Sequence, residues 1–181
     1  MKYKVFYQNA GAININNFLE KIKYHTELFN SIFGENNWAY TGSASVILYT
    51  LKYLPSDIGT LNEPNDIDIL VQSRQAISNN SIGNYIRDQK TLEKSVTFRN
   101  SEFNESIDVT IIPKLKILII DNNPVLDINI LFDDYDDFLS GNRIGDEPKI
   151  KILSQIKKLI DKEESTSKDF SHLNDIKGSL F

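Results

Sequence analysis

The sequence contains no cysteine and only two histidines among its 181 residues. The absence of thiols excludes disulfides, iron–sulfur clusters, thiolate metal sites and cysteine nucleophiles. Two histidines also argue against a multi-histidine zinc site. Oxygen atoms are therefore the metal ligands that this chain offers in number.

Long apolar runs are missing as well. No segment approaches the roughly 20 apolar residues that a membrane-spanning helix needs. At the start of the chain, Lys4 interrupts a short apolar patch, which lacks the core of a signal peptide. We therefore expect a soluble, cytoplasmic protein with no membrane partner.

Basic residues are few, and arginine is scarce. The chain has 4 Arg, and its 20 Lys+Arg stand against 25 Asp+Glu, which gives a net charge of −5. This balance argues against broad polyanion binding and against a long polynucleotide groove. The acidic residues are therefore the main candidates for catalytic or metal-binding groups.

The apolar pattern predicts helices and strands in alternation. Apolar spacing indicates a helix over residues 15–33 that Gly34 closes, and a second helix over 44–54 with Ser43 near its N-cap. Alternating apolar residues predict a strand over 66–71. The other expected elements are a strand at 3–7, a helix at 72–89, strands at 94–98, 107–112, 117–120 and 125–132, a helix at 149–160, a charged loop at 161–167 and a short helix at 168–178.

These elements predict an α+β fold, with a small mixed β-sheet packed on helices and a helical C-terminal appendage. The 40% hydrophobic content is enough for one domain with its own core. We expect this domain to span residues 1–147. Residues 148–181 would form a helical segment packed on it rather than an independent domain.

Two acidic residues stand out in the strand at 66–71. Asp66 and Asp68 are two positions apart, so they point to the same face with Cα atoms about 6.6 Å apart. Two carboxylates in this arrangement can converge on a hard divalent cation, and Mg²⁺ is the expected ion with Mn²⁺ as the alternative. An edge strand with a solvated face explains the same pattern and stays open.

The bare Asp-x-Asp pattern has low specificity. With 15 Asp in 181 residues, such a triplet arises by chance about once in a chain of this length. A second copy, Asp134-Tyr135-Asp136, lies in an acidic cluster over residues 133–137, and we interpret it as a solvated loop or helix start.

A third acid lies inside another predicted strand. Asp108 follows Ile107 and precedes Val109, and an aspartate in such a strand is disfavoured unless it has a partner. A cation shared with Asp66 and Asp68 would supply that partner. Without a cation, three neighbouring carboxylates would repel one another.

Gly42 and Ser43 open the second predicted helix. A Gly-Ser pair at a helix N-terminus offers backbone N–H groups, a hydroxyl and the positive end of the helix dipole. These groups can bind phosphate. An ordinary capped helix has the same sequence signature, so both interpretations stay open.

Taken together, Gly42-Ser43 before a helix, the strand Asp66-Ile67-Asp68 and the later Asp108 resemble the polymerase β-like nucleotidyltransferase superfamily, in its minimal, stand-alone form. The resemblance implies Mg²⁺-dependent transfer of a nucleoside monophosphate from a nucleoside triphosphate, such as ATP, to a hydroxyl acceptor with release of pyrophosphate. It implies that Gly42 and Ser43 hold the triphosphate, that Asp66 and Asp68 bind two Mg²⁺ ions, and that Asp108 binds the ion that activates the attacking hydroxyl.

The C-terminal segment adds a weaker similarity. Lys168-Asp169 followed by Asp175-Ile176 resembles a helix found in many stand-alone members of the superfamily. By this resemblance Lys168 would bind the nucleotide, while pairing with a neighbouring acid is the alternative.

Three interpretations of function remain after these steps. The first is a nucleotidyltransferase whose acceptor is a small molecule, a protein or an RNA end such as that of tRNA. The second is a catalytically inactive nucleotidyltransferase-like module that binds nucleotide or a partner. The third is an α+β interaction domain in which the aspartate pairs are coincidental.

Overall fold

We describe the fold from a computed structural model of the chain. The structure describes residues 13–72, 78, 80–88, 94–101, 105–139 and 147–178, with the backbone alone at 136–139 and 166–178. The elements in chain order are α1 (Ile15–Phe33), β1 (Trp38–Tyr40), α2 (Gly42–Tyr53), the 3₁₀ helix η1 (Pro55–Thr60), β2 (Asp66–Val71), β3 (Ser81–Ile82), β4 (Tyr85–Arg87), β5 (Ser95–Asn100), β6 (Glu105–Ile111), β7 (Ile117–Ile120), β8 (Asn123–Leu126), α3 (Ile128–Leu139) and α4 (Glu147–Gly178).

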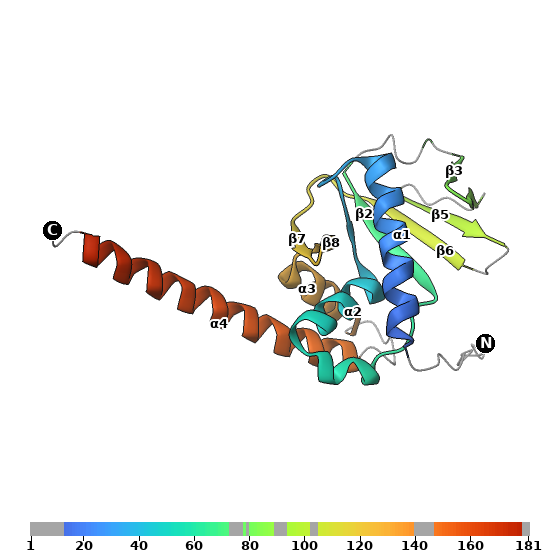
Figure 1. The fold of residues 1–181 in the computed structure, drawn as a ribbon. Coiled ribbons are helices and arrows are strands. Elements are labelled where there is room, and N and C mark those ends of the chain that lie inside the picture. The colour runs from blue at the N-terminus through green and yellow to red at the C-terminus, as the bar shows by residue number, and fades with distance from the viewer. Residues whose placement is uncertain are drawn as a thin grey trace.

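One mixed sheet of eight strands organises the described part of the chain, in the order β3-β4-β5-β6-β2-β1-β8-β7. Strand β2 lies in its middle, parallel to β6 and antiparallel to β1. Helix α1 lies across the sheet, while α2, α3 and the first turns of α4 lie together beside it (Figure 1). The predicted α+β class is confirmed.

Helix α1 has the bounds that the apolar spacing predicts. The Asn14 side chain accepts a hydrogen bond from the backbone N–H of Asn17 at the start, and Gly34 ends the helix with a φ of 80°. Its buried face packs aromatic rings on β1: the Phe29 ring centroid lies 5.0 Å from that of Trp38 and 6.1 Å from that of Tyr40. These contacts fix α1 on the sheet.

Two predicted elements are wrong because tertiary packing overrides local pattern. The helix expected over 72–89 is replaced, where the structure describes it, by β3 and β4. Gly83 turns the chain there with a φ of 54°, and Ile82 and Tyr85 on either side are buried. The strand expected over 125–132 ends with β8, since the Asp127 carboxylate accepts from the backbone N–H of Asn129 and starts α3.

The C-terminal region also differs from the prediction. The charged loop expected over 161–167 is part of α4, which runs without interruption from Glu147 to Gly178 and extends away from the sheet (Figure 1). Lys162, Glu163 and Glu164 in this segment are good helix formers, so its charge did not indicate a loop.

No helix in the described ranges has the length and apolar character to cross a membrane. The strand expected at 3–7 lies outside the described residues.

Candidate metal and nucleotide site

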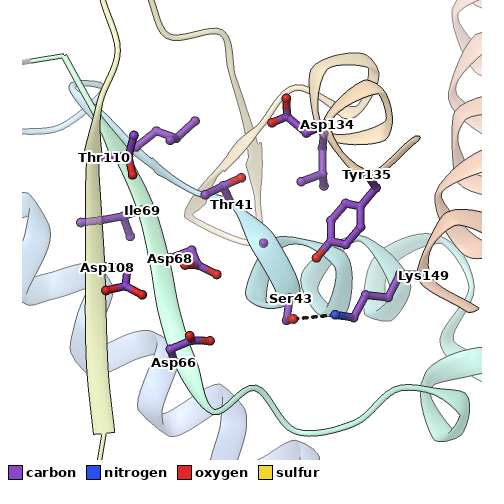
Figure 2. Close-up of a pocket in the computed structure, with 13 residues that line it drawn as sticks. Thr41, Ser43, Asp66, Asp68, Ile69, Asp108, Thr110, Asp134, Tyr135 and Lys149 are labelled. Carbon is purple, nitrogen blue, oxygen red and sulfur yellow. Dashed lines mark hydrogen bonds between the residues drawn. The ribbon is translucent and has the colours of Figure 1, made fainter. Parts of the chain in front are cut away.

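Parallel pairing of β2 with β6 brings the three predicted carboxylates together. Asp68 and Asp108 are direct cross-strand partners, and Asp66 lies one step along the same face of β2. The oxygen atoms that the three side chains can offer lie within 4.8 Å of one another. They line one wall of a cavity of about 470 Å³ (Figure 2). The predicted convergence is therefore present.

Successive side chains of β2 point alternately into the hydrophobic core and toward the cavity. Ile67, Ile69 and Val71 are buried on one face, while Asp66 and Asp68 are partly exposed on the other. All six residues of β2 pair in register with β6, so side chains of paired residues project from the same face of the sheet. Asp108 therefore projects from the same face as its partner Asp68. The aspartates therefore reach the cavity without entering the core.

The electrostatics of the cluster fit a cation. The pKa of Asp66 is raised, first by burial and then by the negative charge of Asp108, and the Lys149 ammonium partly offsets this. An all-oxygen donor set from three carboxylates suits Mg²⁺ or Mn²⁺ and disfavours softer ions. These residues therefore fit the metal that the sequence predicts.

Gly42 lies against the carboxylate of Asp68. Its φ is 58°, and a Cβ built on it would lie 2.2 Å from Asp68 Oδ2. The backbone N–H of Thr41 also donates to the Asp68 carbonyl at 3.0 Å, which holds the start of α2 against β2. Only glycine fits here, both for the backbone conformation and for this close approach.

Ser43 lies beside a lysine that the sequence did not indicate. Lys149 Nζ donates to Ser43 Oγ at 2.9 Å and lies 5.5 Å from the centroid of the Tyr135 ring. All three residues line the cavity opposite the aspartates (Figure 2). The N-cap of α2 is Thr41 rather than Ser43, and Thr41 makes no side-chain capping bond. Ser43 therefore presents its hydroxyl to the cavity.

Sequence reasoning missed Lys149 because it lies 106 residues from Ser43. A weak local signal exists: Lys149 lies in the first turn of α4, where the helix dipole disfavours a cation. Lys168, the predicted nucleotide-binding lysine, lies about 28 Å further along the same helix at 1.5 Å per residue. Its side chain is outside the described residues, so its role stays a prediction.

The second Asp-x-Asp triplet lies on α3 rather than in a loop or at a helix start. Asp134 lines the cavity, and Tyr135 is buried beside it with 9% exposure. The side chain of Asp136 lies outside the described residues. Helix α3 thus supplies a wall of the cavity that the composition of residues 133–137 did not predict.

Solved structures of other proteins have a similar fold. No protein-family model matches the chain, and no curated protein matches it in sequence. Among solved structures, it is similar to ANT(2")-Ia in complex with adenylyl-2"-tobramycin, with a TM-score of 0.53 and 10% identity over 82% of this chain and 99% of that one. It is also similar to the Megavirus polyadenylate synthase, with a TM-score of 0.56 and 10% identity over 87% of this chain.

Both of these neighbours are polymerase β-like nucleotidyltransferases, and the chain has their fold. The fold resemblance predicted from Gly42-Ser43, Asp66, Asp68 and Asp108 is confirmed. The chain spans 40% of the length of the polyadenylate synthase, and nearly all of the shorter ANT(2")-Ia chain.

Proposed function

We propose that this protein is a metal-dependent nucleotidyltransferase that moves a nucleoside monophosphate from a nucleoside triphosphate to a hydroxyl acceptor. One observation carries the proposal: three carboxylates from β2 and β6 converge at the cavity wall that faces the N-terminus of α2. A cation at the carboxylates and a polyphosphate at the helix N-terminus would be adjacent there.

In the proposed reaction, the acceptor oxygen forms a bond to the α-phosphorus of the triphosphate. The bond from that phosphorus to the bridging oxygen breaks, pyrophosphate leaves with the electron pair, and the hydroxyl proton passes to solvent. Bound Mg²⁺ would supply charge neutralisation on the phosphates and a lower pKa for the acceptor hydroxyl.

The residues of this chain position these groups. Asp66 and Asp68 would hold two ions, and Asp108 would hold one of them jointly. Gly42 lets the Asp68 carboxylate lie close to the start of α2, while the Ser43 hydroxyl and the Lys149 ammonium would bind triphosphate oxygens there. Positioning and electrostatics are the main means of catalysis available here.

The neighbours suggest acceptor classes to test. ANT(2")-Ia holds an adenylylated tobramycin and the Megavirus enzyme is a polyadenylate synthase, so this fold serves both a small hydroxylated molecule and an RNA end. We propose an acceptor from these classes or a protein hydroxyl, with tRNA among the RNA candidates.

The direct test is label transfer. Each of the four α-³²P-labelled triphosphates would be incubated with the protein and Mg²⁺ or Mn²⁺, against panels of aminoglycosides, tRNA and proteins. We expect labelled acceptor in at least one panel and none in EDTA. Asp66→Asn and Asp68→Asn should abolish transfer while leaving the melting temperature in EDTA within a few degrees of wild type. Wild-type turnover in either variant would refute the metal-site assignment.

A thermal shift with each triphosphate separates the alternatives. Metal-dependent stabilisation without label transfer in any panel would favour an inactive nucleotide-binding module. No response to any triphosphate, with or without metal, would leave an α+β interaction domain as the explanation.

A further inference from the structure

The Asp108 side chain is held from the neighbouring strand β5 by Thr97. The two residues are direct partners in the antiparallel register of β5 and β6. The Thr97 hydroxyl donates to Asp108 Oδ1 at 2.5 Å. This distance lies in the range of charge-assisted hydrogen bonds between a hydroxyl and a carboxylate, which are about twice as strong as neutral ones.

Without such a bond, the cluster of acids would favour another orientation of Asp108. The oxygen atoms that Asp66, Asp68 and Asp108 can offer lie within 4.8 Å of one another, so their negative charges repel. A rotamer of Asp108 directed away from the other two would relieve this repulsion. The Thr97 hydroxyl opposes that change because it has a single proton and donates it to Asp108.

Thr97 is also well suited to fix a geometry. It is a β-branched residue in the middle of β5, so its χ1 has few accessible rotamers. The strand register places it directly beside Asp108, and both residues lie within paired strands. The hydroxyl is therefore presented by rigid elements, as a group that orients a metal ligand needs to be.

We infer that Thr97 is a positioning residue, which holds the Asp108 carboxylate toward Asp66 and Asp68 and thereby sets the affinity of the site for a divalent cation. This inference rests on the proposed function for the identity of the cation site. It assigns no contact between Thr97 and the nucleotide or the cation.

The test measures cation binding without nucleotide or turnover. Mn²⁺ alone would be titrated into the full chain and free Mn²⁺ followed by electron paramagnetic resonance. Thr97→Val keeps the branched shape and removes the hydroxyl, so we expect Mn²⁺ affinity to fall about 10- to 100-fold, as for other residues that orient metal ligands. Thr97→Ser retains the hydroxyl and should bind Mn²⁺ within about threefold of wild type. Asp108→Asn provides the reference for loss of the ligand charge.

Thr97→Cys keeps the test decisive if the valine variant does not fold. The cysteine side chain is similar in overall size to threonine but its thiol is only a weak donor, so this variant should also lose affinity. Melting temperatures in EDTA establish that each variant is folded. Affinity equal to wild type in a folded Thr97→Val or Thr97→Cys variant would overturn the inference and leave the proposed function standing. Absence of Mn²⁺ binding by the wild-type protein would overturn both.

Discussion

The Gly42→Ala variant should damage the site far more than the fold. The added Cβ would lie 2.2 Å from Asp68 Oδ2, whereas real Cβ contacts essentially never fall below 3.0 Å. The carboxylate would have to retreat by at least about 0.8 Å, several times the roughly 0.2 Å tolerance of metal–ligand distances. A misplacement of this size at a reacting centre can cost about 100-fold in rate.

The effect on stability is smaller and has two opposing parts. An alanine at a φ of 58° costs about 1–2 kcal/mol, because its Cβ crowds the following carbonyl. Loss of chain entropy in the unfolded state returns about 0.4–1 kcal/mol. The net loss is about 1 kcal/mol, which lowers the melting temperature of a chain of this size by about 2–4 °C.

Gly59 offers a matched control on the same chain. It lies in η1, and an added Cβ there would meet nothing within 4 Å. We expect Gly59→Ala to match wild type in Mn²⁺ affinity and label transfer, with an unchanged or slightly higher melting temperature. Both variants would be assayed for Mn²⁺ binding, for label transfer and by thermal melts in EDTA. A Gly42→Ala variant with wild-type affinity and turnover would refute the steric argument.

Other variants test the remaining contacts. Lys149→Ala should weaken the affinity for nucleoside triphosphate about tenfold or more, because it removes the charged donor beside Ser43. The loss is read as a smaller nucleotide-dependent thermal shift, and the exposed neighbour Lys151 serves as an alanine control. Burial and, next, the charge of Lys21 lower the pKa of His25 to about 4 from 6.5. Because His25 takes up a proton less readily in the folded than in the unfolded protein, the free energy of unfolding should fall by about 3 kcal/mol in all as the pH is lowered from 6.5 to 4. Urea melts at each pH should show this slope, and His25→Gln should flatten it. Tyr85→Phe removes the hydroxyl that donates to Glu105 at 2.8 Å and contacts His25 Nε2, which should cost about 1–3 kcal/mol in the same melts.

Local pattern was sufficient for part of this molecule. Helix α1 and strand β2 have their predicted bounds, since a long amphipathic repeat and a two-residue alternation are both local signals. The two aspartates of β2 could also be placed on one face, because they are two positions apart in a strand. Their meeting with Asp108 was predicted from the family pattern, but its basis is a parallel pairing between strands distant in sequence.

Other features depend on contacts that no local window contains. Lys149 joins Ser43 across 106 residues, and its position follows from where α4 begins on α2 and α3. The hairpin of β3 and β4 forms because Ile82 and Tyr85 gain burial that an exposed helix would not give them. The bond between Thr97 and Asp108 likewise follows from strand register rather than from either sequence neighbourhood.

The register of β2 with β6 determines whether the three carboxylates lie together. Slippage by a single residue would turn Ile107 or Val109 toward the cavity and carry Asp108 into the apolar interior. A charged group placed there without a partner is strongly unfavourable. The same error would therefore expose core residues and dismantle the cation site. A chain whose sheet has assembled in the correct register has, by that fact, already aligned its three carboxylates.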